Sequence, residues 1–382
     1  TLFEVSTSVF SNNDADVAGG AFYSNDACIV DGTAFTDNTS NYGGAVYFDD
    51  NSAAIDGSTF SDNSAGTSGG AIRWRDDTAS ADMTITTSLF AGNSAGDYGG
   101  AFAFRTGDEF VMNDNSLFNN TADYGGAVSI YDIPDVTGIR NRFCGNVATF
   151  HAGALRLNNT GGSANEWTNN IYIDNSASDE GGGLYIQDAG DMDFTNNTIV
   201  GNSSSEGGGL WVSSTDVYYT NNILAWTGNG SAIDADSSSN LAIIYSDFFD
   251  NSPGDLSGGT SSTIGTNNNI TDDPDLTYVS LDGVCGNDQL WPNTGSPVID
   301  AGDPSIIDTD GSASDIGAYG GPDAFEIDTE TDNDGDGYTA DEDCNDFDAS
   351  VNPGAPEVCN TIDDNCDGIV DGSSANGQST YY

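Results

Sequence analysis

The sequence predicts an all-β fold, a right-handed parallel β-helix (a solenoid) of about ten turns followed by a small calcium-loop module. Two short signals, Gly-Gly-Ala and Phe-x-x-Asn, alternate along the first two thirds of the chain. Apolar residues are spaced by two after each Gly-Gly pair, as in strands that bury one face. The apolar spacing of 3.6 residues that helical hairpin repeats need is absent from these units.

The Gly-Gly pairs set the period of the repeat. Their second glycines are Gly20, Gly44, Gly70, Gly100 and Gly126. The copies therefore recur every 24 to 30 residues, which fits one β-helix turn per copy. A degenerate copy follows at 151–155, and glycine triplets follow at 181–183 and 207–209.

The alternation also predicts which side chains form the core. Two residues after the second glycine the chain has Phe22, Val46, Ile72, Phe102, Val128, Leu155, Leu184 and Leu210. Four residues after it the chain has Phe48, Trp74, Phe104, Ile130, Leu157, Ile186 and Val212. The position between these two core columns holds Tyr23, Tyr47, Arg73, Ala103, Ser129, Arg156, Tyr185 and Trp211. We expect it to face outward, because a guanidinium is not stable in a dry interior.

Phenylalanines and asparagines predict two further stacks. One aromatic column is expected from Phe10, Phe35, Phe60, Phe90, Phe118 and Phe143. Asparagine pairs recur at 169–170, 196–197 and 221–222. We expect one member of each pair to form an amide ladder, and asparagine also tolerates the left-handed backbone that a corner needs. The glycines are expected at a second corner, where a Cβ would clash.

The repeat fades after residue 252, and this divides the chain into four parts. We expect the β-helix in 1–252, its terminal turns and cap in 253–322, an acidic calcium-binding module in 323–372 and a linker or tail in 373–382. A cap is expected because open strand edges would pair with other chains.

The acidic module carries a calcium-loop pattern. The loop has carboxylates at positions 1, 3, 5 and 12, which are Asp332, Asp334, Asp336 and Asp343. Its position 7, which offers a backbone carbonyl, is Tyr338. A second, poorer copy is supplied by Asp363, Asn365, Asp367, Ile369 (through its carbonyl) and Asp371. The cofactor expected here is Ca²⁺.

These motifs resemble two known families. Over residues 1 to 215, the alternating signals resemble the polymorphic outer-membrane proteins of chlamydiae and related β-helix surface proteins, which implies an adhesin or surface passenger without a shared catalytic site. The acidic and cysteine-containing span from Asp343 to Gly368 is similar to the acidic metal-binding repeat of secreted bacterial proteins, which implies calcium on its carboxylates. Residues 296–303 and 315–320 resemble the closing segment of exported bacterial β-helix proteins.

The charge excludes two partner classes. The chain has 61 acidic residues against six arginines and no lysine, for a formal net charge of −55. Such a surface repels nucleic acid and anionic membranes and attracts cations. No apolar run is long enough to span a membrane, and no signal peptide is visible. The composition favours an extracellular or cell-surface protein, secreted by a bacterium; an acidic coat for solubility or high salt is the alternative reason for the charge.

We expect no catalysis. His151 is interpreted as a substitution at the glycine corner, without partners nearby in the sequence. Polysaccharide-active enzymes of this fold need a base, and Arg73 and Arg75 lie beside Asp76 and Asp77, which indicates surface ion pairs instead.

The cysteines indicate crosslinking only near the C-terminus. Cys28 and Cys144 are several turns apart, so we expect both to be reduced and buried. The pairing among Cys285, Cys344, Cys359 and Cys366 is left open.

The sequence therefore favours a non-catalytic extracellular structural protein, a calcium-stabilised subunit of a surface fibre that self-associates head to tail. The first alternative is a monomeric cell-surface adhesin whose outward aromatic row binds glycans. The second is a polysaccharide-active β-helix enzyme.

Overall fold

The computed structural model describes residues 2–162, 165–258, 266–285, 288–326, 336–339, 343, 349–356, 358 and 364–366. The chain forms two compact units, one of Thr1–Pro274 with Pro297–Phe325 and the other of Asp275–Ser296 with Glu326–Tyr382. Residues 275–296 belong to the second unit, and the boundaries expected at 253 and 323 stay a prediction.

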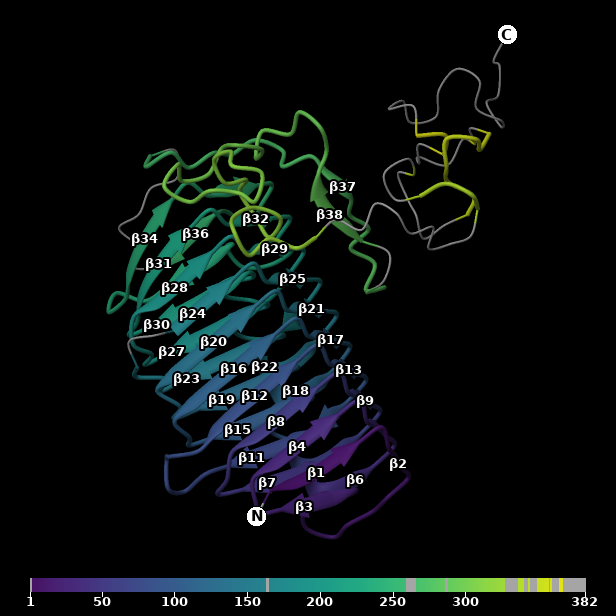
Figure 1. Cartoon of the computed structure of the whole chain (residues 1–382). Helices are drawn as coiled ribbons and strands as arrows, with labels where there is room; N and C mark the ends of the chain where they lie inside the picture. The colour runs from purple at the N-terminus through teal and green to yellow at the C-terminus, as the bar shows by residue number, and fades with distance from the viewer. Residues whose placement is uncertain are drawn as a thin grey trace. The chain divides into compact units, whose positions relative to one another are not determined.

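The first unit is a parallel β-solenoid of about ten turns, as the repeat predicts (Figure 1). Each turn contributes one strand to each of three ten-stranded parallel sheets, here named A, B and D, and six turns contribute a strand to a fourth, sheet C. Sheet A consists of β1 (Phe3–Ser6), β4 (Cys28–Asp31), β8 (Ala53–Asp56), β12 (Asp82–Thr86), β16 (Glu109–Asn113), β20 (Asp135–Ile139), β24 (Asn165–Thr168), β28 (Met192–Thr195), β31 (Asp216–Thr220) and β34 (Asn240–Ile244). Sheet B consists of β2 (Val9–Ser11), β5 (Ala34–Thr36), β9 (Thr59–Ser61), β13 (Leu89–Ala91), β17 (Ser116–Phe118), β21 (Arg142–Cys144), β25 (Ile171–Ile173), β29 (Thr198–Val200), β32 (Ile223–Ala225) and β35 (Asp247–Phe249).

Sheets C and D complete the cross-section. Sheet C consists of β6 (Thr39–Tyr42), β10 (Ser64–Ser68), β14 (Ser94–Ala95), β18 (Thr121–Tyr124), β22 (Val147–His151) and β26 (Ser176–Ala177). Sheet D consists of β3 (Phe22–Ser24), β7 (Val46–Asp49), β11 (Ile72–Arg75), β15 (Phe102–Arg105), β19 (Val128–Tyr131), β23 (Leu155–Asn158), β27 (Leu184–Gln187), β30 (Leu210–Ser213), β33 (Ile233–Ala235) and β36 (Leu256–Gly258). In the second unit, β37 (Leu276–Tyr278) and β38 (Gln289–Pro292) form an antiparallel pair. Among the described residues there is no helix of a kind that could span a membrane.

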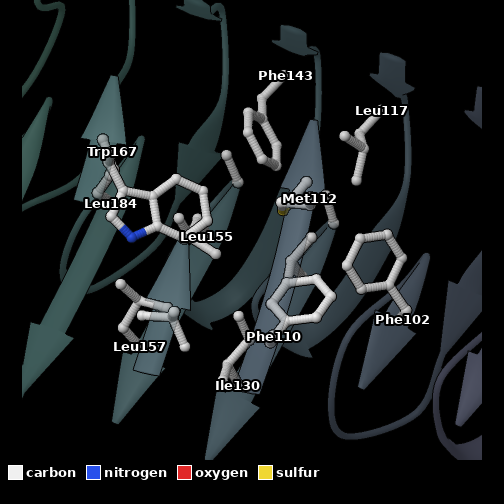
Figure 2. Packing of buried hydrophobic residues seen from close by; sticks show 14 of the residues in the cluster. Phe102, Phe110, Met112, Leu117, Ile130, Phe143, Leu155, Leu157, Trp167 and Leu184 are labelled. Carbon is white, nitrogen blue, oxygen red and sulfur yellow. The ribbon is translucent and has the colours of Figure 1, made fainter. Parts of the chain in front are cut away.

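Both predicted core columns are confirmed. The register of sheet D aligns Val46, Ile72, Phe102 and Val128 in one column, and the second column is aligned in the same way. Figure 2 shows how side chains from three sheets meet inside: Phe102 and Leu155 come from sheet D, Phe110 and Trp167 from sheet A and Phe143 from sheet B. All five are fully buried.

The aromatic column of sheet B is confirmed except at one turn. Phe35, Phe60 and Phe90 stack with ring centroids 4.7 and 4.8 Å apart and nearly parallel planes. At the next turn the register places Leu117 in the column, and Phe118 pairs with the outward Ala91, so the assignment of Phe118 to the stack was wrong. Period counting misplaced it because Ser116–Phe118 offers two adjacent apolar residues.

The asparagines form two buried ladders. The first joins the side chains of Asn13, Asn38, Asn63, Asn93, Asn120, Asn146, Asn175 and Asn202. The second joins Asn115, Asn141, Asn170, Asn197 and Asn222, so the second member of each predicted pair forms the ladder. The first members, Asn169, Asn196 and Asn221, take a positive φ, as predicted for a corner.

The glycine corner is equally specific. A Cβ on Gly126 would lie 2.2 Å from the carbonyl oxygen of Gly153 in the next turn, and its neighbour Gly125 has a φ of +67°. No other residue fits that stacked position, which explains why the Gly-Gly pair recurs.

The segment Pro297–Phe325 returns to the side of the solenoid. The amide Nδ2 of Asn169 donates to the carbonyl oxygens of Ala318 and Gly320, and Asn196 donates to that of Asp315. Asn221 Oδ1 accepts from the Asp303 amide. These hydrogen bonds reach the corner asparagines of three successive turns, and the expected cap in 253–322 stays a prediction. In the last turn, Ile270 pairs with Asp247.

Candidate functional site: a groove lined by tyrosine and arginine

Three outward columns of side chains run along the solenoid, and between Tyr42 and Arg156 they line a groove. The first, the floor, holds Tyr23, Tyr47, Arg73, Ala103, Ser129, Arg156, Tyr185 and Trp211 on sheet D. The second, also on sheet D, holds Asp49, Arg75, Arg105, Tyr131, Asn158 and Gln187. The third runs along sheet C and its extension and holds Tyr42, Ser68, Tyr98, Tyr124, His151, Glu180 and Glu206. In-register parallel strands bring the residues of each column into line along the solenoid.

The floor faces away from the core, as predicted, but much of it is not exposed. Tyr47 is 9 % exposed, Ser129 3 % and Tyr185 6 %, and the ring of His151 in the third column lies 5.1 Å from that of Tyr185. The prediction that this position is solvent-facing is therefore corrected. Aromatic rings stack within two of the columns: Tyr23 on Tyr47 and Tyr185 on Trp211 in the floor, and Tyr98 on Tyr124 in the third column, with centroids 5.4, 4.5 and 5.3 Å apart.

Small side chains make the floor hollow. Ala103 and Ser129 occupy the two turns between Arg73 and Arg156. A cavity of about 400 Å³ lies over them, with Tyr42, Arg73, Tyr98, Arg105, Tyr131 and Arg156 among its lining. A second cavity of about 430 Å³ is lined in part by the same Tyr42, Arg73 and Arg105. Both volumes fall within the usual range for ligand pockets.

Arg73 is held in the floor by one hydrogen bond. Its Nη1 donates to the carbonyl oxygen of Ala103 at 3.1 Å. Burial lowers the pKa of Arg73 to about 10, so the guanidinium still carries its charge at neutral pH. The surface ion pair expected for Arg73 is wrong, whereas the pair of Arg75 with Asp77 is confirmed. Asp76 is fully buried and accepts the amides of its own turn, including those of Ser80 and Ala81.

Arg156 sits among aromatic rings. Its guanidinium carbon lies 5.7 Å from the centroid of Tyr98, 6.0 Å from Tyr124 and 5.8 Å from Tyr185, within the range of cation–π attraction. Its Nη1 lies 3.4 Å from Ser129 Oγ, and its Nε is buried without a hydrogen bond. Arg105 lies over the ring of Tyr131 at 5.7 Å. In the part of the chain that the structure describes, Arg73, Arg105 and Arg156 make no ion pair with a carboxylate.

His151 lies in the wall of the groove, not at the corner. Ala152, with a φ of +63°, takes the place of the first glycine, and His151 pairs with Tyr124 and Glu180. The corner interpretation was one residue out of register. His151 Nδ1 is 3.1 Å from Glu180 Oε2, in a geometry that makes no hydrogen bond, and burial lowers the pKa of the imidazole. The pKa of Glu180 is raised by burial and by the nearby Glu206 and Asp179.

The sequence reasoning missed the third column. A signal was present, because a tyrosine directly precedes the Gly-Gly pair at Tyr42, Tyr98 and Tyr124. A tyrosine fixed relative to the glycine corner in several turns must form a column, and with the period known this column could have been predicted.

The acidic module is described in part. Of the predicted metal ligands, Asp336, Tyr338, Asp343 and Asn365 are described, and Asp332, Asp334, Asp363, Asp367, Ile369 and Asp371 lie outside the described residues. The amide of Tyr338 donates to Asp336 Oδ1 at 2.9 Å, which closes a tight turn at the predicted loop. Asp343 Oδ1 lies 3.9 Å from Cys366 Sγ, so the twelfth position of the first loop meets the second motif copy.

The described residues of the predicted loops include oxygen ligands of the types that hard cations prefer. Asp343 is only 2 % exposed, and a buried carboxylate is stable where donors or a cation surround it. Within the described residues no three His, Cys, Asp or Glu side chains cluster closely enough to hold a metal. Asp336, Asp343 and Asn365 would supply oxygen ligands, the type that hard cations prefer.

The cysteines differ from the prediction at one position. Cys28 is free and buried, as expected. Cys144 is disulfide-bonded, so the expectation of a reduced Cys144 was wrong; the distance argument excluded a bond to Cys28 but not to a third cysteine. Cys285 and Cys366 are also disulfide-bonded.

Two family models match parts of the chain. The Chlamydia polymorphic membrane protein repeat matches residues 57–73, which include strands β9 and β10. A model described as "Putative metal-binding motif" and named for copper binding matches residues 318–342 and 343–372. No curated protein and no solved structure gave a match. The chain thus carries a stretch similar to the repeat of Chlamydia polymorphic membrane proteins, which favours a surface or outer-membrane location, and the match to the metal-binding motif follows it in the sequence.

Proposed function

We propose that this protein is an extracellular, surface-displayed β-helix that binds glycans in the groove and does no catalysis. The observation that carries the proposal is the cavity of about 400 Å³ between tyrosine walls. Flat, rigid aromatic faces pack against the apolar faces of sugar rings, and the surrounding hydroxyls and guanidinium groups can bond sugar oxygens. The repeats similar to those of chlamydial surface proteins support display outside the cell.

The absence of catalysis is part of the proposal. The side chains named around the cavity, Arg73, Tyr98, Arg105, Tyr131 and Arg156, are of types that hold their protons at neutral pH and so serve poorly as general bases. His151 and Glu180 lie in the third column and are not among the described residues that line the cavity of about 400 Å³. A polysaccharide-active enzyme remains the alternative, and it predicts product release from a bound glycan, which reducing-end assays measure.

A glycan array tests the binding proposal. Tyr98→Ala removes one wall of the cavity and should abolish retention of the glycans that the wild-type protein retains. Tyr218→Ala is the matched control, because Tyr218 is an exposed tyrosine on sheet A, outside the groove. Retention that survives Tyr98→Ala, or a wild-type protein that retains nothing, contradicts the proposal.

A second candidate is the subunit of a fibre assembled head to tail. In the described residues, β1, β2 and β3 each have a neighbour on one side only, and Leu2, Val9 and Val17 are more than half exposed. A strand of a second copy, or of chain that precedes Thr1, would continue these sheets. Electron microscopy of purified protein with and without excess chelator tests the fibre: filaments that dissolve in chelator support it, and unchanged monomers in calcium contradict it.

We further propose calcium as the ion of the acidic module. The matched family model is named for copper, but copper favours imidazole and sulfur ligands. The residues 318–372 that the motif matches contain no histidine, and Cys366 is disulfide-bonded and so offers no thiolate. The carboxylates Asp336 and Asp343 favour a hard cation instead. Calorimetric titration of the protein with Ca²⁺ and with Cu²⁺ decides between the metals, and tighter binding of Cu²⁺ that Asp343→Asn leaves unchanged refutes calcium.

A further inference from the structure

We infer that the groove selects a sugar that carries a carboxylate, and that Arg73, Arg105 and Arg156 receive this carboxylate. The inference rests on the proposed glycan binding and names the chemical class of its ligand. It follows from where the few positive charges of the chain lie, how they are held and what fits between them.

The first step concerns charge. The chain has six arginines against 61 acidic residues, and four of the six, Arg73, Arg75, Arg105 and Arg156, line the two cavities. Carboxylates surround the protein in excess, yet among the described residues only Arg75 of these four pairs with one. Because the other three guanidinium groups have no carboxylate partner in the described part of the chain, they are available to pair with an anionic ligand.

The second step concerns burial. Arg73 and Arg156 are largely buried, and removing a charge from water without an opposite charge is unfavourable. Tyrosine rings compensate part of this cost for Arg156 through cation–π contacts. The same rings fix the guanidinium in place, so a ligand that pairs with it loses little further freedom on binding. Arg156 also lines the cavity of about 400 Å³, so its guanidinium borders the space that a ligand would occupy.

The third step concerns shape. Arg73 and Arg105 line both cavities, and Arg156 lies at the far side of the hollow above Ala103 and Ser129. A carboxylate between them can accept from two or more guanidinium groups, and Arg is suited to planar, bidentate pairing with it. Tyr98 and Tyr131 then face the ring that carries the carboxylate.

The fourth step limits the ligand to few charges. A formal net charge of −55 repels a long polyanion at every turn outside the groove, and this disfavours nucleic acid and highly charged polysaccharides. A terminal or isolated uronic acid residue on an otherwise neutral glycan meets the arginines without this repulsion. The predicted ligand is therefore an oligosaccharide with one acidic sugar.

Isothermal titration calorimetry of the full chain tests the inference with matched disaccharides. The three probes share one neutral sugar joined to D-glucuronic acid, to its methyl ester or to D-glucose. We expect the acid to bind at least tenfold more tightly than the ester and the glucose form, because charge-assisted bonds to arginine are lost. Raising the salt concentration should weaken binding of the acid and leave that of the ester unchanged.

Two variants locate the carboxylate. Arg105→Gln, at an exposed residue whose loss the fold should tolerate, is expected to abolish the preference for the acid over the ester; Arg156→Gln should do the same if its melting temperature shows that it folds. Arg140→Gln is the control, because Arg140 pairs with Asp114 outside the cavities. An unchanged preference in Arg105→Gln overturns the inference.

The outcomes separate the inference from the proposed function. Equal affinity for acid, ester and glucose form overturns the carboxylate site and leaves glycan binding in place. A sulfated disaccharide that binds more tightly than the acid overturns the choice of carboxylate. If none of these probes binds and a full glycan array retains nothing, the proposed function itself fails.

Discussion

Replacing Asn120 by aspartate tests how far the asparagine ladders hold the turns together. Asn120 lies within the first ladder and is fully buried. Its Nδ2 donates to Asn146 Oδ1 and to the carbonyl oxygen of Phe90, both at 3.0 Å. Its Oδ1 accepts the backbone and side-chain amides of Asn93, also at 3.0 Å. Aspartate keeps the shape and the accepting oxygen but turns the donor into a second acceptor.

The loss can be worked from these bonds. Two hydrogen bonds to Nδ2 disappear, and an oxygen now faces two acceptor oxygens in a site without water. At about 1 kcal/mol for each lost bond and about 1–3 kcal/mol for a buried polar group left unpaired, the variant should lose about 3–5 kcal/mol of unfolding free energy. Part of the loss should return at low pH, because a protonated carboxyl can donate to one of the two acceptors.

Urea unfolding followed by circular dichroism, at neutral and at acid pH, measures the effect. Asn119→Asp is the matched control, because Asn119 is the adjacent, exposed residue and the equivalent corner positions of other turns hold Asp37 and Asp62. If Asn120→Asp lowers the unfolding free energy no more than Asn119→Asp does, the ladder contributes no specific stability and the reasoning is refuted.

Three further predictions follow from other sites. Burial and the nearby Asp272 raise the pKa of Asp247 from 3.8 to about 7, so the free energy of unfolding should fall as the pH rises between these two values. Asp247→Asn should abolish this pH dependence and raise the melting temperature at pH 8. The control Asp250→Asn, at an exposed residue, should do neither. Gly126→Ala should lower the melting temperature by several degrees, since its Cβ would lie 2.2 Å from Gly153 O; a wild-type temperature would contradict the corner clash. Adding excess chelator should remove protease protection from the acidic module and leave the solenoid intact; protection that persists in chelator contradicts a structural cation.

The sequence is sufficient to predict the solenoid because its repeats constrain one another. Val46, Ile72 and Phe102 sit at equal offsets from their glycines, and only a stack of parallel strands brings such positions together. The one core error, Phe118, arose where two adjacent residues were both apolar, so hydrophobicity could not choose between them. The register chose Leu117 because strand alternation is fixed by the neighbouring turns.

The groove was harder to predict because it depends on two sheets. Alternation predicts that Arg73 and Arg156 point away from the core, but not that Tyr98 and Tyr124 of the third column lie against Arg156. His151 shows the same limit: its partner Glu180 is a whole turn away in sequence and adjacent in space. The position of a residue relative to the glycines of its own turn predicts whether its side chain is buried. Contacts between two columns depend instead on the angle between the sheets, which the corners set.

The segment Pro297–Phe325 has a mechanical consequence. A solenoid whose turns touch only their neighbours unravels one turn at a time when it is pulled from an end. Here the segment is tied to Asn221, Asn196 and Asn169 and reaches Arg140, whose Nη1 donates to the carbonyl oxygen of Asp323. Tension applied at this end would therefore act on several turns at once. These turns would resist unfolding by force together and would unfold as one cooperative block.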